Sequence, residues 1–152
     1  MALIIGITGK IGSGKTTVGE FIEKKYDFSS YSFADPLKKI GLAFGFEYNQ
    51  LYGTQEEKME INKYWNITAR TFLQKFGTDI CRNVLPETIP DMNLGENKTL
   101  WVRLFEIHIS KLVNKNNACI VISDVRFKDE AEIIKSMGGY IISVERKNNP
   151  NK

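Results

Sequence analysis

The chain has few residues that could form disulfide bonds or bind a metal ion. Of its 152 residues, two are cysteine, one is histidine and four are proline. Cys81 and Cys119 lie far apart and form no metal-binding pattern, so we expect reduced thiols of the kind found in cytosolic proteins. His108 stands on an apolar helical stripe, and we interpret it as structural.

Long apolar runs and a strong charge imbalance are also missing. No run approaches the ~20 apolar residues of a membrane-spanning helix, and no secretory leader pattern opens the chain. The net charge of +3, from 21 basic and 18 acidic residues, suits anionic small molecules better than nucleic acid. We therefore expect a cytoplasmic protein without membrane or direct nucleic-acid partners; a homodimer stays an open alternative.

One stretch carries most of the functional information. Residues 9–16 have the phosphate-binding loop pattern G-x-x-x-x-G-K-[ST], between an apolar run at 3–8 and a helical pattern at 15–26. Its glycines let backbone N–H groups approach a phosphate, while Lys15 would reach the β- and γ-phosphates of ATP and Thr16 would bind Mg²⁺. The expected nucleotide-binding residues are Gly9, Lys10, Ile11, Gly12, Ser13, Gly14, Lys15, Thr16 and Thr17.

The order of the expected elements indicates the fold class. Strands are predicted at 3–8, 31–33, 118–123 and 140–145, and helices alternate with them. Such alternation predicts a mostly parallel sheet with helices on both faces, an α/β fold of three α/β/α layers. The length of 152 residues predicts a single domain, residues 1–152.

The segment between the second and third strands is less regular. Asp35 before Pro36 looks like a helix N-cap, and Thr68 could cap a helix that ends at Gly77. A short helix is predicted over 79–85, a loop over 86–98 and a long amphipathic helix from Trp101 to Leu112. Residues 49–66 could form a surface helix or a lid, and 49–98 together could be an acceptor-binding insertion.

Acidic and basic side chains follow the later strands. In a parallel sheet, ligands bind beyond the carboxyl ends of the strands, which is where Asp35, Asp124 and Arg126 should meet the phosphate loop. Asp124 could hold Mg²⁺ or simply cap the next helix, and Arg126 could bind an acceptor phosphate or pair with a neighbouring carboxylate. Asp35 could act directly or only cap its helix. Arg70 could reach a phosphate or extend into solvent.

Together these pieces resemble the deoxynucleoside monophosphate kinases of large DNA phages and related viral and bacterial sequences. The resemblance covers about residues 3–146. It is carried by the phosphate loop and by Phe33-Ala34-Asp35-Pro36-Leu37-Lys38, Arg70 through Gly77-Thr78-Asp79, Leu100-Trp101-Val102-Arg103-Leu104-Phe105 and Ser123-Asp124-Val125-Arg126 with Glu130. It implies a P-loop kinase that transfers the γ-phosphoryl group of ATP, with Mg²⁺, to a deoxynucleoside monophosphate. If the chain is viral, the host cytoplasm is the expected location.

The resemblance also implies roles for particular residues. Lys15, Arg70 and Arg126 would be catalytic, and Thr16 with Asp124 would bind the metal. The acceptor would be held by Asp35, Lys38, Arg70, Trp101, Arg126 and Glu130. By spacing alone, Trp101 is a core residue; the resemblance makes it a base-contacting one.

Three alternatives remain beside this interpretation. The phosphate loop is also similar to the opening of dephospho-coenzyme A kinase, in which Asp35 would serve as a base. The second alternative is a nucleotide-dependent switch or binding module with no small-molecule acceptor. The Asn-Lys-x-Asp motif that reads guanine is absent from 114–117, which disfavours a GTPase switch. Relatives usually continue past the strand at 140–145, whereas this chain stops at Lys152. We therefore expect that strand at a sheet edge, and a truncated ATP-binding protein without turnover is the third alternative.

Overall fold

The computed structural model describes residues 2–96, 98–112 and 118–147, and it divides the chain into two compact units. Unit 1 is built from two segments, up to residue 33 and from residue 102 onward, and unit 2 is the continuous segment 34–101. The insertion predicted at 49–98 falls within unit 2. The prediction of one kinase domain over 1–152 stays a prediction.

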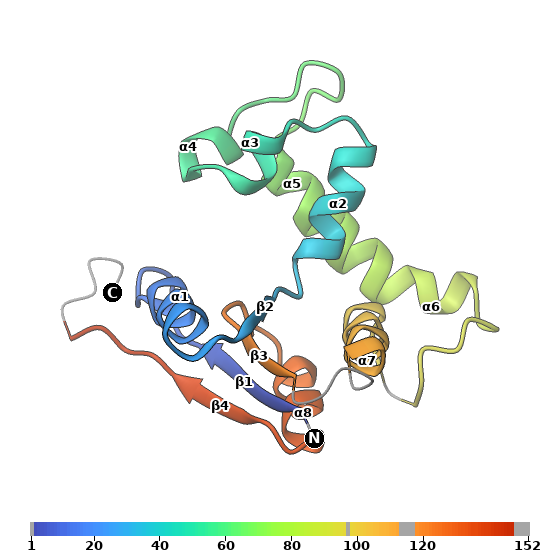
Figure 1. Cartoon of the computed structure of the whole chain (residues 1–152). Helices are drawn as coiled ribbons and strands as arrows, with labels where there is room; N and C mark the ends of the chain where they lie inside the picture. Colours follow the sequence, from blue (N-terminus) through green and yellow to red (C-terminus); the bar gives the residue numbers. More distant parts are fainter. Residues whose placement is uncertain (1, 97, 113–117, 148–152) are drawn as a thin grey trace. The chain divides into compact units, whose positions relative to one another are not determined.

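An all-parallel sheet forms the centre of unit 1 (Figure 1). Its described strands are β1 (Leu3–Thr8), β2 (Ser29–Tyr31), β3 (Cys119–Ile122) and β4 (Tyr140–Ser143), in the order β2-β3-β1-β4. β1 pairs with β3 from Leu3↔Cys119 onward and with β4 from Ile5↔Tyr140 onward. β4 lies at an edge of the described sheet, as expected.

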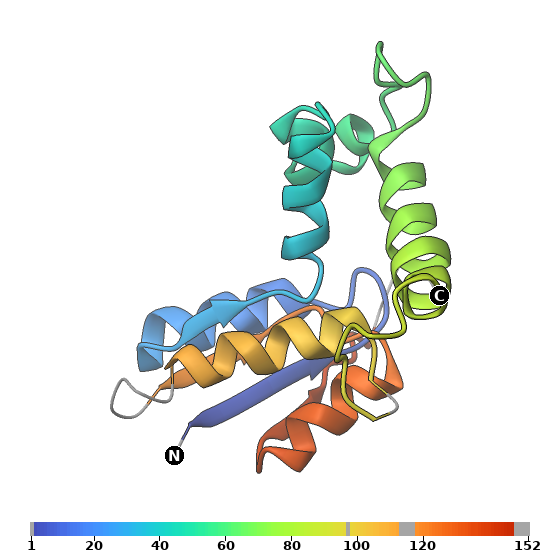
Figure 2. The ribbon, with the colours of Figure 1, turned by 90° about the vertical axis from the view of Figure 1, so that its right-hand side faces the viewer.

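Helices cover both faces of this sheet. Gly19 of α1 (Lys15–Tyr26) approaches Ile7, whereas Gly6 faces Ile134 of α8 (Lys128–Ser136). Successive residues of a strand point to opposite faces, so α1 and α8 lie on opposite sides of β1, as Figure 2 shows. The predicted three-layer α/β/α architecture is therefore confirmed.

An aromatic cluster attaches α7 (Leu100–Leu112) to the end of β2. Phe105 lies 5.1 Å from Tyr31 and 5.2 Å from Phe33, measured between ring centroids. The His108 ring lies 4.7 Å from that of Tyr31, so the histidine has a packing role, as interpreted from the sequence.

Unit 2 is helical in the described residues. It contains α2 (Asp35–Ala43), α3 (Tyr48–Tyr52), α4 (Gln55–Lys58), α5 (Ala69–Gln74), η1 (a π-helix, Lys75–Val84) and α6 (Leu85–Thr88). The last three run on from one another as a single helical rod, drawn in green in Figure 2. The core of this unit contains Phe46, Leu51, Ala69 and Phe72.

Three local predictions were wrong. The helix capped by Thr68 does not end at Gly77, which lies inside η1, because a Cβ there would sit 2.5 Å from Leu37 and only glycine lets the two helices approach. Part of the loop predicted over 86–98 is helical, since α6 begins at Leu85 and includes Pro86. The second strand covers 29–31 rather than 31–33, because Ser32 and Phe33 bond to the Asp124 side chain.

Candidate phosphate-transfer site

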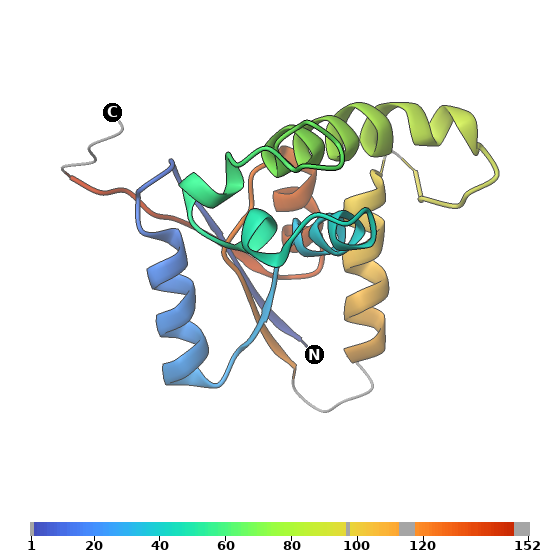
Figure 3. The same cartoon turned by 90° about the horizontal axis from the view of Figure 1, so that it is seen from above.

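A turn joins the end of β1 to the start of α1 (Figure 3), and it has the positive φ angles that the glycine pattern predicts. Gly9, Gly12 and Gly14 all have positive φ angles, of 154°, 75° and 99°. A Cβ on Gly9 would also lie 2.5 Å from the Val144 carbonyl oxygen. Gly14 is the N-cap of α1 and offers no side-chain bond to the first N–H groups of that helix. The turn therefore presents backbone donors to an anion.

Ser13 supplies a second polar group in the same turn. The residue is 6% exposed, and its Oγ has no hydrogen-bond partner among the described residues. Its backbone N–H donates to the Lys10 carbonyl at 3.1 Å, so the main chain is held at this position. A buried hydroxyl without a partner costs roughly 1–3 kcal/mol, which an anion accepting from it would offset.

Lys15 lies over the carbonyl groups of the loop. Its Nζ donates to the oxygens of Gly9 at 2.7 Å and Lys10 at 2.8 Å. Burial, together with the positive charge of Arg126, holds the pKa of Lys15 below its ordinary value. Arg126 therefore lies close enough for its charge to be felt at the loop, and both cations favour an anion there.

Asp124 is held by the two residues that follow β2. Its Oδ2 accepts a hydrogen bond of 2.7 Å from Ser32 Oγ, and its Oδ1 accepts one of 3.1 Å from the backbone N–H of Phe33. These bonds replace the next rungs of the ladder, which is why β2 ends at Tyr31. The N-cap of α8 is Phe127, so Asp124 does not cap that helix, which removes one alternative. The Val125 N–H donates to the Ile7 carbonyl and ties this segment to β1.

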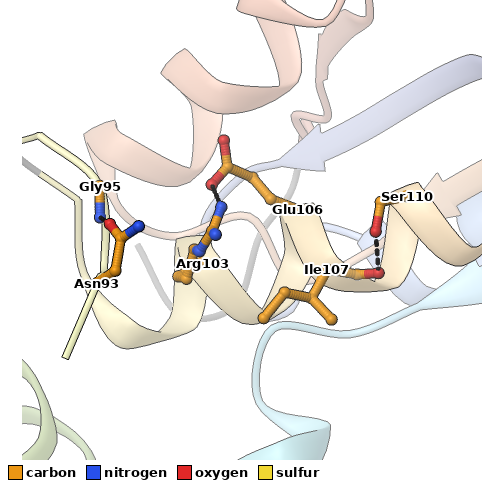
Figure 4. A network of polar contacts seen from close by, with 6 residues as sticks. All are labelled: Asn93, Gly95, Arg103, Glu106, Ile107 and Ser110. Atoms are coloured by element: carbon orange, nitrogen blue, oxygen red, sulfur yellow. Dashed lines mark hydrogen bonds and ion pairs between the residues drawn. The ribbon is translucent and has the colours of Figure 1, made fainter.

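Arg126 and Glu130 lie on the turn that enters α8. Glu130 is 3% exposed, and its Oε2 accepts from the backbone N–H groups of Arg126 at 2.8 Å and Phe127 at 3.0 Å. Burial raises the pKa of Glu130 above its ordinary value, although these two hydrogen bonds work against the rise. Among the described residues, the exposed Arg126 guanidinium makes no ion pair. Arg103, in contrast, pairs with Glu106 at 3.2 Å (Figure 4).

In unit 2, Asp35 differs from the prediction of an N-cap. The N-cap of α2 is Ala34, and Asp35 is the first helical residue. Its carboxylate accepts a 2.7 Å hydrogen bond from the Tyr52 hydroxyl and pairs with Lys39 at 2.8 Å. Burial acts to raise the pKa of Asp35, but the bonds from Lys39 and Tyr52 hold it below its usual value. Lys38 lies 4.8 Å from the centroid of the Tyr52 ring.

The other two candidates of unit 2 differ in exposure. Arg70 is an exposed residue of α5, with no ion pair among the residues that the structure describes. Trp101 is 6% exposed, and its indole N–H donates to the Gly77 carbonyl at 3.1 Å. The core role deduced from spacing fits this burial, and the base contact stays a prediction.

Two residues beside these candidates were not anticipated from the sequence. Ser32 bonds to Asp124 and Tyr52 bonds to Asp35, over separations of 92 and 17 residues. A serine directly after β2 and an aspartate two residues after β3, its neighbouring strand, was the available signal for the first pair. No periodicity connects the second.

The sequence-predicted residues are thus divided between the units. The phosphate loop, Asp124, Arg126 and Glu130 belong to unit 1, and Asp35, Lys38, Arg70 and Trp101 belong to unit 2. In the described parts of the chain, His, Cys, Asp and Glu side chains form no cluster of three or more that could hold a metal ion. None of the helices described has the length and apolar character that a membrane crossing requires. Residues 114–117 and 148–152, which entered the sequence argument, lie outside the described residues.

Comparison with known proteins gives two matches. A family model described as "Deoxynucleotide monophosphate kinase" matches residues 41–152, a segment that begins after the phosphate loop. The chain is also similar to the "Putative deoxynucleotide monophosphate kinase" of Acanthamoeba polyphaga mimivirus. The two are 42% identical over 147 residues, which cover 95% of this chain and 74% of that protein.

Proposed function

Since the chain belongs to the deoxynucleotide monophosphate kinase family, we propose that it transfers the γ-phosphoryl group of ATP to a deoxynucleoside monophosphate. The observation that carries the donor half of this proposal is the glycine turn, with the buried Ser13 hydroxyl that has no partner among the described residues and the Lys15 ammonium in the same loop. The nature of the acceptor comes from the family.

The loop binds the triphosphate of ATP. Backbone N–H groups of residues 9–14 and of the first turn of α1 donate to phosphate oxygens, and Ser13 Oγ finds there the partner that it lacks. Lys15 exchanges the Gly9 and Lys10 carbonyls for the β- and γ-phosphates. Because this exchange replaces neutral acceptors with anionic ones, the new hydrogen bonds are the stronger set.

A hydroxyl and a carboxylate are available for Mg²⁺. Thr16 is exposed at the start of α1, and Asp124 follows β3, the strand that pairs with β1. Hydroxyl, carboxylate and phosphate oxygens are the ligands that Mg²⁺ prefers, so the donor set fits the ion. When bound, Mg²⁺ neutralises charge on the phosphates. The absence of a protein-only cluster among the described residues agrees with a site completed by the nucleotide.

Arginines hold the acceptor. Arg126 and Arg70 are exposed guanidinium groups without ion pairs in the described parts of the chain, so their planar forks can bind a phosphate in bidentate fashion. Asp35, Lys38, Trp101 and Glu130 complete the acceptor set of the proposal. An oxygen of the acceptor phosphate attacks the γ-phosphorus, and the bond from that phosphorus to the β–γ bridging oxygen breaks, releasing ADP. The attacking oxygen is already ionised, so no strong base is required.

An acceptor panel in a coupled ADP-release assay tests this function. The panel contains the four common deoxynucleoside monophosphates, their ribonucleotide counterparts and dephospho-coenzyme A, with ATP and Mg²⁺ in excess. We expect turnover with at least one deoxynucleotide. Turnover with dephospho-coenzyme A alone would transfer the assignment to that reaction, and ATP binding with no turnover on any acceptor would leave only a nucleotide-binding protein.

A further inference from the structure

The Asp124 carboxylate accepts hydrogen bonds from a backbone donor and from a side-chain donor. Phe33 supplies a backbone N–H at 3.1 Å to Oδ1, and Ser32 supplies a side-chain hydroxyl at 2.7 Å to Oδ2. The first donor belongs to every residue type except proline, so substitution at position 33 leaves it in place. The second depends on the serine, which makes it the part of the arrangement that the sequence specifies.

The two bonds together fix the plane of the carboxylate. One bond leaves the group able to rotate about the Cβ–Cγ axis, whereas bonds to both oxygens define which lone pairs face each direction. A hydroxyl-to-carboxylate bond of this length belongs to the strong, charge-assisted class.

We propose that Ser32 is a positioning residue that orients Asp124 for Mg²⁺ in the nucleotide complex. The inference rests on the proposed function, in which Asp124 binds the ion. Ser32 acts through the aspartate: its hydroxyl holds Oδ2 and thereby sets the orientation of the carboxylate. Outer partners of this kind typically contribute about 10- to 100-fold to metal affinity when they are removed.

A structural role alone would have a different consequence. If the Ser32 bond only joined the ends of β2 and β3, its loss would lower the melting temperature and leave the metal dependence of nucleotide binding unchanged. Ser30 provides the matched control, because it is a serine of β2, two residues before Ser32, and its hydroxyl bonds to Glu23 at 3.4 Å rather than to Asp124.

The experiment measures the equilibrium affinity of the full chain for ADP, once with Mg²⁺ and once with EDTA, by calorimetry. The ratio of the two affinities is the Mg²⁺ enhancement. We expect Ser32→Ala to lower this enhancement about 10-fold while the affinity in EDTA changes by less than about 2-fold. Ser32→Thr keeps a hydroxyl at position 32 and should keep the enhancement. Ser30→Ala leaves Ser32 untouched and should also keep the enhancement, whereas Asp124→Asn should lose it.

The outcomes separate this inference from the function beneath it. A wild-type enhancement in Ser32→Ala, with its loss in Asp124→Asn, would overturn the role of Ser32 and leave the metal role of Asp124 intact. An enhancement kept by Asp124→Asn, or absent from the wild type, would overturn both assignments, while the acceptor panel still decides the kinase activity. If Ser32→Ala does not fold, Ser32→Cys keeps the shape with a weaker donor; an intermediate enhancement supports the role and a wild-type value rejects it.

Discussion

At the scale of single residues, two side chains of the phosphate loop have polar groups poorly matched to their present surroundings. The Ser13 hydroxyl is buried without a partner among the described residues, and the Lys15 ammonium is satisfied by carbonyl groups of its own loop. Neither arrangement adds much to the stability of the chain. Both become favourable when an anion enters the turn, which is the property expected of binding groups that were selected for function.

Lys15→Ala should reduce phosphoryl transfer by at least about 100-fold, because it removes a cation from the charge that develops on the phosphates. The fold should remain, since the bonds lost are to two loop carbonyls only. The measurement is the coupled assay together with circular dichroism. Lys24→Ala, an exposed lysine in the last turn of α1, is the control. Undiminished turnover in Lys15→Ala would contradict the role assigned to the loop.

Glu130→Gln should change how stability depends on pH. Burial raises the pKa of Glu130 in the folded state above its unfolded value, so the folded chain binds this proton more tightly. The resulting contribution is fully present below the unfolded pKa and is lost as the pH rises through the folded pKa. The stability advantage of the wild type over Glu130→Gln should therefore shrink as the pH rises above 4.5, the ordinary pKa of a glutamate.

Urea unfolding of both proteins at several pH values measures this advantage. Taking the difference between the two proteins removes the titration of the other carboxylates, which Glu130→Gln leaves unchanged. A difference that stays constant with pH would show that Glu130 titrates normally in the folded chain.

At the scale of elements, the contact of α1 with the sheet sets where the phosphate loop stands. Gly19 is buried in that contact, and a Cβ there would meet the side chain of Ser123 on the segment after β3. The helix therefore approaches the sheet closely just one turn after Lys15. The glycine fixes the distance between the loop and the carboxyl end of β3, where Asp124 follows.

Gly19→Ala should destabilise the chain by about 1–2 kcal/mol, because the cost of overpacking exceeds the gain in helix propensity. Combining it with Ser123→Gly should recover part of that loss, since the side chain that the new methyl meets is removed. Thermal unfolding of the two single variants and the double variant gives the coupling. Glu20→Ala, exposed on the same helix, should change stability by less than ~0.5 kcal/mol. Strictly additive effects would mean that α1 shifts away without strain.

Comparison of the predicted and observed elements shows which features local sequence patterns can predict. The boundaries of β1 and α1 were predicted residue for residue, because an apolar run, a glycine turn and a helical stripe are all local signals. Gly77 was misread because its role is a contact with Leu37, forty residues earlier in the chain. Asp35 was misread because the same residue type serves as N-cap or as first helical residue; here its carboxylate accepts from the distant Tyr52 hydroxyl instead of capping the helix.

The candidate site also divides into residues that local sequence patterns reveal and residues that only the fold brings together. Its phosphate loop is contiguous and could be found directly, and Asp124 and Arg126 could be placed because parallel strands end at one edge. Ser32 and Tyr52 could not, because their bonds join segments whose proximity arises only when the fold forms.

At the scale of the whole molecule, the candidate residues belong to two units. The segment 49–66, in unit 2, exposes large apolar side chains, including Met59, Ile61, Tyr64 and Trp65. A segment of this character can gain burial when it closes over a substrate.

We predict slower amide hydrogen exchange in 49–66 when both nucleotides are bound than with either alone. Closure would shield these amides from water. Exchange measured by mass spectrometry on the free, singly bound and doubly bound protein tests this, with β1 as the internal control because its amides are already in the sheet. Exchange that is indifferent to the second nucleotide would rule out a lid.

The order in which the strands of unit 1 occur along the chain has a consequence for folding during synthesis on the ribosome. β1 pairs with β3 and β4. Leu3 therefore cannot pair until Cys119 has been synthesised, and Ile5 cannot pair with β4 until Tyr140 has been synthesised. At typical synthesis rates of about 5–20 residues per second, β1 stays without β3, the first of its two partners to be made, for about 6 to 23 s. Unit 2 is one uninterrupted segment, complete by residue 101. The phosphate loop, although made almost first, is therefore among the last parts of the enzyme to acquire its working shape.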